Sequence, residues 1–284
     1  VGENFQTQQP VQDPNQTSQA WWTLFKAFLA WVLSVACLLI VPLVLVIPYL
    51  VYLSMSGSET SADILMKDKT FIFLSILGVI PAHVLTLFAA WALQTSWGKL
   101  PFFQSLRMSW PSSISPWLGV VLCGVGAVVL LAVGGLVTSI LGGGKTDLDM
   151  LIESSFQARL ATVALAVFTA PLVEEIIYRG MLYPAIQRVL GMGWAVAVVT
   201  AMFAGVHVYQ YRTNIGVIVV ITMLSLTLTL VRALTDRLLP AVVIHLVFNG
   251  IQALVLLLQP FLEKPKVTPP PAVPALVEFI RHLI

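Results

Sequence analysis

Charged residues are scarce in this chain, and their scarcity excludes an ordinary soluble fold. Asp, Glu, Lys and Arg make up only 10% of the 284 residues, against roughly 25% in typical soluble domains. Hydrophobic residues make up 58%, and the mean hydropathy is +0.92. A soluble protein could not cover so much apolar surface, whereas a bilayer accepts it. The composition therefore predicts an all-α, polytopic integral membrane bundle.

Cysteine pairs and dense basic clusters are also lacking. Cys37 and Cys123 lie in apolar runs, so we expect small buried hydrophobic residues rather than a disulfide or a metal pair. The net charge is +2, and no group of Lys and Arg is dense enough to indicate nucleic acid as a partner. The expected partner is the lipid bilayer, which we expect to contact most of the protein surface.

Hydrophobic runs divide the chain into four regions. Residues 1–20 are polar and free of Lys and Arg, and we expect a disordered tail there. Residues 21–155 are expected to form N-terminal membrane helices, and residues 156–258 a second membrane region that carries the polar residues. Residues 259–284 form a Pro-rich linker and a short amphipathic segment that can lie on the membrane surface.

Seven spans are expected, with six to eight as the range that the pattern allows. Pro42 and Pro48 are expected to kink the first span or to break it near its end. The positive-inside rule favours an inside N-terminus only when the C-terminal tail is left out of the count. The seven expected spans lie within residues 21–55, 71–93, 117–141, 156–190, 194–209, 215–234 and 239–258.

Ionisable side chains enter the apolar spans in the second half of the chain. Each costs at least ~2.5–3.5 kcal/mol at the centre of a membrane helix, so function is the default explanation. Glu175 and Arg179 are four residues apart, share a helix face and are expected to pair. Glu174 points elsewhere and is left free to take a proton. The alternative is a buried ion-pair network that only holds helices together.

Two further elements carry histidine at membrane depth. If the helices on either side of the intervening turn are antiparallel with equal rise, Glu174 and His207 lie at the same level. Such a Glu–His pair can hold and deprotonate a water molecule. His245 and Asn249 are four residues apart and point the same way, so both could donate hydrogen bonds to one oxyanion.

These elements, in this order, resemble the CPBP family of intramembrane proteases, which includes Rce1-type CAAX prenyl endopeptidases and bacterial abortive-infection homologues. The family pattern is EExxxR, then FxxxH, then HxxxN or HxxxD. The chain has EEIIYR at 174–179, FAGVH at 203–207 and HLVFN at 245–249. The resemblance covers residues 156–258 and implies a CPBP-like catalytic core there.

The resemblance implies a role for each matching residue. It makes Glu174 the residue that activates water, with His207 as its partner, and His245 and Asn249 the pair that stabilises the oxyanion. The supporting residues are Glu175, Arg179 and Phe203. The implied reaction is hydrolysis of a peptide bond by direct attack of water on a membrane-associated protein or peptide. In eukaryotic members that substrate is a prenylated CAAX protein, and the expected location here is a bacterial inner (cell) membrane.

Two alternatives stay open from the sequence. Glu174, His207 and His245 are a plausible zinc ligand set, which would make the protein a zinc-dependent membrane metalloprotease. The adjacent glutamates and the absence of an HExxH motif favour chemistry that requires no cofactor. The second alternative is a non-proteolytic immunity protein or an accessory subunit of a larger membrane complex.

Overall fold

Every described element of the computed structural model is helical. The structure describes residues 14–262, with side chains over residues 17–258. Within this part of the chain seven helical stretches are long and apolar enough to cross a membrane, which confirms the predicted all-α polytopic bundle. They are Thr17–Met55, Lys69–Thr95, Pro116–Leu141, Phe156–Leu190, Met192–Tyr211, Ile215–Thr235 and Leu239–Leu258.

The first helix, α1 (Pro14–Met55), differs from the prediction at both ends. The described part of this helix includes residues 14–20, where the sequence predicted a disordered tail. The rest of that tail and the predicted C-terminal amphipathic segment lie outside the described residues. The helix also continues through Pro42 and Pro48, so of the kink or break expected there, the break does not occur.

The second span consists of two helices that join beside α1. Helices α3 (Lys69–Leu77) and α4 (Val79–Thr95) meet at Gly78, after the short α2 (Ala62–Leu65). A Cβ atom on Gly78 would lie 2.6 Å from the Cα of Pro42. Only glycine allows this close approach of the two backbones.

A loop, a third span and a short helix lead from α4 to the second membrane region. The loop contains the four-residue α5 (Phe102–Ser105), and α6 (Pro116–Leu141) forms the third span. Helix α7 (Asp147–Ser154) starts with a capping box between Thr146 and Asp149, which satisfies two otherwise free backbone N–H groups.

The fourth span is not a regular α-helix. It runs through α8 (Phe156–Ala164), the π-helical η1 (Leu165–Thr169), α9 (Ala170–Glu175), the π-helical η2 (Ile176–Leu182) and α10 (Tyr183–Leu190). Single π-helical turns inside α-helices occur frequently at functional sites. Because two of them lie in this one span, the short helix α9 between them is a candidate location for a functional site.

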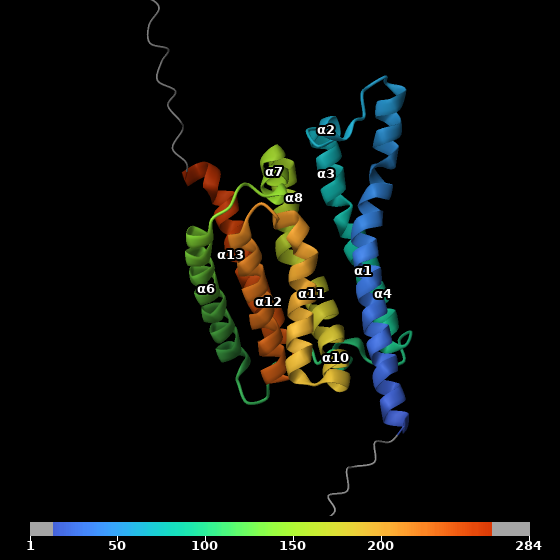
Figure 1. Ribbon diagram of the computed structural model, residues 1–284, viewed down its shortest axis with the longest axis vertical. Coiled ribbons are helices and arrows are strands. Elements are labelled where there is room, and N and C mark those ends of the chain that lie inside the picture. The colour runs from blue at the N-terminus through green and yellow to red at the C-terminus, as the bar shows by residue number, and fades with distance from the viewer. Residues whose placement is uncertain (1–13, 263–284) are drawn as a thin grey trace, which may run out of the picture.

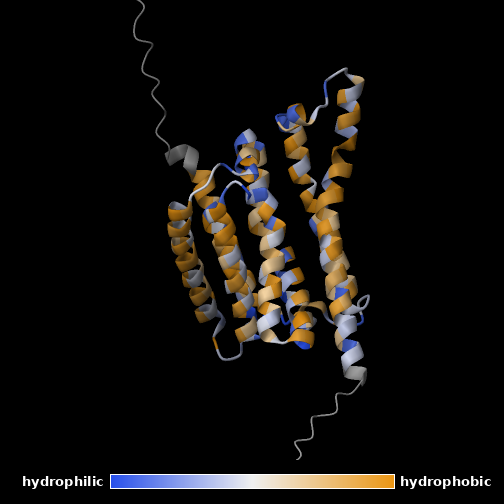
Figure 2. Cartoon of the chain, viewed as in Figure 1, coloured by the Kyte–Doolittle hydropathy of each residue, from blue (hydrophilic) through white to orange (hydrophobic). Residues whose placement is uncertain are grey.

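The three remaining helices complete the bundle around this fourth span. They are α11 (Met192–Tyr211), α12 (Ile215–Thr235) and α13 (Leu239–Leu262). Helices α1 and α4 pack on one side of the fourth span, and α13, backed by α6, packs on the other (Figure 1). Hydrophobic residues cover most of every long helix (Figure 2), which is the surface expected to contact lipid.

Candidate active site

The two adjacent glutamates of α9 lie in different environments. The Glu175 side chain is completely buried, whereas 25% of the Glu174 side chain is exposed. Glu175 Oε1 lies 2.9 Å from Nη1 of Arg179 and 2.9 Å from Nδ1 of His245. The predicted ion pair between Glu175 and Arg179 is therefore present, and the same carboxylate also binds a histidine.

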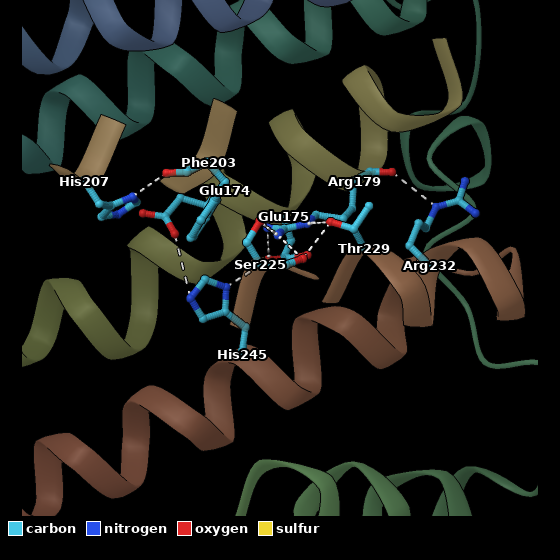
Figure 3. Close-up of polar contacts among 9 residues, drawn as sticks. All are labelled: Glu174, Glu175, Arg179, Phe203, His207, Ser225, Thr229, Arg232 and His245. Atoms are coloured by element: carbon cyan, nitrogen blue, oxygen red, sulfur yellow. Dashed lines mark hydrogen bonds and ion pairs between the residues drawn. The ribbon is translucent and has the colours of Figure 1, made fainter. Parts of the chain in front are cut away.

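Arg179 is fully buried and is held on every side (Figure 3). Its Nε donates to Thr229, and its Nη2 donates to the backbone carbonyl and the hydroxyl of Ser225. Its guanidinium carbon lies 4.6 Å from the centre of the Phe203 ring, a distance at which the cation and the ring attract each other. Phe203, predicted as a supporting residue, thus contacts the ion pair directly.

Glu174 has no arginine partner among the described residues. Its Oε2 lies 3.7 Å from Nε2 of His245, which is beyond direct hydrogen-bonding distance. Figure 3 shows the carboxylate between the rings of His207 and His245. The fourth span and α11 thus bring Glu174 and His207 next to each other, although no direct hydrogen bond joins them within residues 17–258.

The orientation of the His207 ring is fixed by its own helix. Nδ1 lies 2.8 Å from the carbonyl oxygen of Phe203, one turn earlier in α11. A carbonyl oxygen can only accept, so Nδ1 is the donor, and in the neutral imidazole the free lone pair is then on Nε2. The rings of Phe203 and Tyr211 lie on either side, with centroids 4.7 and 6.4 Å from that of His207.

His245 and Asn249 point to different partners on the fourth span. The two nitrogens of His245 face the two glutamates, whereas Nδ2 of Asn249 donates to the carbonyl oxygen of Ala166 at 2.9 Å. Ala166 lies in η1, where a second contact comes from α4: Nδ1 of His83 lies 2.8 Å from the hydroxyl of Thr169. The π-helical η1 is therefore held by side chains from α13 and α4, as η2 is held at Arg179 by side chains from α12.

The predicted zinc ligands do not form a recognisable metal cluster. Over the part of the chain that the structure describes, no group of three or more His, Cys, Asp or Glu side chains is arranged to hold a metal ion. Within the proposed set of Glu174, His207 and His245, the nearest described contact is the 3.7 Å between Glu174 and His245.

Three buried polar residues near the site were missed by the sequence analysis. Ser225, Thr229 and Arg232 lie on α12, and all three are almost completely buried. Their spacing of four and three residues places them on one helix face. Polar residues at this spacing in an apolar span were a visible signal, but their partners lie on another helix and cannot be read from α12 alone.

Comparison with known proteins finds a family match for the part of the chain that contains the candidate site. Residues 156–251, about a third of the chain, match the family model described as type II CAAX prenyl endopeptidase, Rce1-like. The match contains the glutamate, histidine and asparagine positions described above. No curated protein and no solved structure matches the chain. The chain therefore carries an Rce1-like region, and at the level of the family this indicates a membrane-embedded protease of CAAX type.

Proposed function

We propose, from the Rce1-like region and its geometry, that the protein is an intramembrane endopeptidase in which Glu174 activates a water molecule. The observation that carries this proposal is the contrast between Glu174 and Glu175. Glu175 is buried and bound to both Arg179 and His245, whereas Glu174 is partly exposed and has no arginine partner among residues 17–258. Neighbouring carboxylates in such different environments take different roles. Glu175 is the structural residue, and Glu174 is the one free to accept a proton.

His207 completes the water-activating pair. Its Nδ1 proton is donated to Phe203, so its Nε2 lone pair can accept a hydrogen bond from a water that Glu174 also holds. Glu174 removes a proton from this water as the water oxygen attacks the peptide carbonyl carbon. The proton then passes to the leaving nitrogen as the C–N bond breaks. The products are a carboxylic acid and an amine, and no acyl-enzyme forms.

His245 and Asn249 are suited to stabilise the tetrahedral intermediate. Nε2 of His245 faces the same space as Glu174, 3.7 Å from its Oε2, and with a proton on Nε2 this nitrogen would donate a hydrogen bond to the oxyanion. Asn249 has two amide hydrogens, and one of them is donated to Ala166. The second amide hydrogen is the one that we propose to donate to the oxyanion.

The proposed reaction requires no metal, because the general base and the oxyanion donors are all protein side chains. The substrate class that we propose is a membrane-associated protein or peptide, with prenylated CAAX peptides as the first candidates because of the family match. The expected bacterial cell membrane remains a prediction, which membrane fractionation of the source cells would check.

The test is cleavage of synthetic CAAX peptides, farnesylated and unmodified, by the purified protein in liposomes. Mass spectrometry should detect release of the last three residues from the prenylated peptide by wild type, with and without EDTA. Glu174→Gln should not cleave, whereas Glu59→Gln should match wild type, because Glu59 is an exposed residue in the loop after α1. Loss of cleavage with EDTA and its return with zinc would support the metalloprotease instead. No cleavage by folded wild type across a library of membrane peptides would favour the non-proteolytic subunit.

A further inference from the structure

Helix α12 carries a stripe of polar side chains that the proposed mechanism does not use. Ser225 and Thr229 are completely buried, and Arg232 is 3% exposed. They lie inside a candidate membrane span with a mean hydropathy of 2.3. Burying hydroxyl and guanidinium groups is costly unless each is hydrogen-bonded. The partners of these three residues should therefore show why the helix contains them.

Two of the three residues hold the side chain of Arg179. Thr229 Oγ1 accepts from Nε at 3.1 Å, and Ser225 accepts from Nη2 through its hydroxyl at 2.8 Å and its carbonyl at 2.9 Å. Nη1 is then left to donate to Glu175 at 2.9 Å. Because the guanidinium group is planar and rigid, fixing Nε and Nη2 also fixes the direction in which Nη1 points.

The third residue holds the backbone of Arg179. Arg232 Nε donates to the Arg179 carbonyl oxygen at 3.2 Å, and this carbonyl lies within the π-helical η2. Nη1 of Arg232 pairs with Asp236 at 2.9 Å, and Asp236 also pairs with Arg107 in the loop after α5. The stripe therefore fixes Arg179 at both its side chain and its main chain.

The position of Arg179 is passed on to His245 through a single oxygen atom. Glu175 Oε1 accepts from Arg179 Nη1 and also lies 2.9 Å from His245 Nδ1. A carboxylate paired with arginine accepts from its histidine neighbour, so Nδ1 is the donor and Nε2 is the nitrogen that faces Glu174. If Arg179 moved, Glu175 and then the His245 ring would lose their present orientation.

We propose that Ser225, Thr229 and Arg232 are positioning residues of the active site, which act through Arg179 and Glu175 to fix the His245 ring. The stripe is absent from the three sequence elements that carry the family resemblance. Its effect on cleavage rests on the proposed proteolytic function, whereas its effect on the histidine ring does not.

The first test observes His245 without any substrate. Protein labelled with ¹⁵N-histidine in nanodiscs contains four histidines, and a His245→Gln variant assigns the signal. Wild type should show His245 with a proton on Nδ1 that exchanges slowly with solvent, because it is donated to Glu175. In Ser225→Ala/Thr229→Val this proton should exchange faster and the ring resonances should move. Unchanged His245 resonances in the folded double variant would overturn the proposal.

Two matched variants separate positioning from general damage to the helix. Thr227 lies roughly half a turn from Ser225 and Thr229, so Thr227→Val should leave His245 as in wild type. Thr229→Ser keeps the hydroxyl and should also keep the wild-type signal. If the double variant does not fold, single Ser225→Ala and Thr229→Val proteins carry the same comparison. An equal effect from Thr227→Val would contradict the proposal.

Kinetics then link the stripe to the proposed function. The double variant should lose roughly 10- to 100-fold in kcat, by analogy with the loss seen when hydrogen-bond partners of metal ligands are removed, with KM unchanged. A changed His245 signal with no cleavage by wild type would keep the positioning role and count against the protease. An unchanged kcat together with an unchanged His245 signal would overturn the positioning role and leave the protease standing.

Discussion

The two membrane regions of this protein differ in where they place their charges. In the N-terminal helices α1, α3, α4 and α6, the buried polar groups are neutral hydroxyls and one histidine, His83, whereas the Rce1-like region buries Glu175, Arg179, Arg232 and His245. Buried charges are expensive and add little net stability. Their concentration in one region is what the proposed active site, with its positioning residues, would require. The described part of the N-terminal helices, in contrast, buries no Asp, Glu, Lys or Arg side chain.

Polar contacts between the regions show how the first supports the second. Trp31 of α1 donates to the hydroxyl of Tyr178 in η2 at 3.0 Å, and His83 of α4 contacts Thr169 in η1. Each π-helical segment thus has one polar contact from the N-terminal helices. Variants in both regions test this difference, because those at the buried charges should lose the most stability or activity and those at the membrane boundary the least.

The largest loss of stability is expected from breaking the buried ion pair. Arg179→Met should lower the free energy of unfolding by about 3–5 kcal/mol, because Glu175 would remain buried without a compensating charge. The measurement is thermal or denaturant unfolding in detergent. Lys69→Met, at the start of α3 and exposed, is the matched control and should change little. A stability loss below that of the control would contradict a central role for the pair.

A smaller effect, confined to catalysis, is expected from Asn249→Ala. Removal of one oxyanion donor typically lowers kcat by about 10²–10³-fold, and the substrate KM should stay close to wild type. Cleavage of the prenylated peptide in liposomes measures both constants. Gln252→Ala, one turn later on α13 and bonded to a backbone carbonyl of its own helix, should leave kcat unchanged. If Asn249→Ala kept full activity, its only role would be the contact with η1.

The contact between the two regions should have a moderate effect. Trp31→Phe removes the hydrogen bond to Tyr178 and should cost about 0.5–1.5 kcal/mol of stability, as for a typical neutral hydrogen bond. Trp22→Phe changes an exposed tryptophan on the same helix and is the control in the same unfolding assay. Equal losses in the two variants would show that ring size, and not the hydrogen bond, is what matters.

The smallest effect is expected at the membrane boundary of the N-terminal region. Burial tends to raise the pKa of Asp68, but hydrogen bonds from the Phe71 and Thr70 backbone N–H groups and from Tyr49 outweigh it and lower the pKa. A carboxyl with a lowered pKa stabilises the fold above its unfolded pKa of about 3.9 and loses this contribution as the pH falls through its folded pKa.

A pH series of melting temperatures checks this boundary effect. Asp68→Asn should melt slightly below wild type at pH 7, and the difference should shrink as the pH is lowered towards about 3. Asp68 is the N-cap residue of α3, and a difference that grew at low pH would contradict its contribution as an ionised carboxylate.

Much of the fold could be predicted because hydrophobic length alone identifies spans. The seven spans and the pair between Glu175 and Arg179 needed only composition and helical spacing. The two π-helical segments could not be predicted, since their register depends on anchors from other helices, such as Asn249 on Ala166. The boundary at residue 20 was not readable from hydrophobicity because residues 14–20 are polar and still helical.

The candidate site was only partly predictable for a similar reason. The motifs identified Glu174, His207, His245 and Asn249, but spacing along separate helices could not show that His245 contacts both glutamates. Nor could it show that Asn249 donates to η1. The role of each residue in the reaction stays a prediction, and it depends on the difference between the adjacent glutamates.

The most direct measurement compares Glu174→Gln with Glu175→Gln in parallel for cleavage and for thermal stability. We expect Glu174→Gln to keep the wild-type melting temperature while kcat falls by about 10²–10⁴-fold, the usual contribution of a general base. We expect Glu175→Gln to lower the melting temperature clearly, because Arg179 would lose its buried counter-charge. If Glu174→Gln cleaved as well as wild type, or if both variants lost stability equally, the division of roles proposed for these two carboxylates would be wrong.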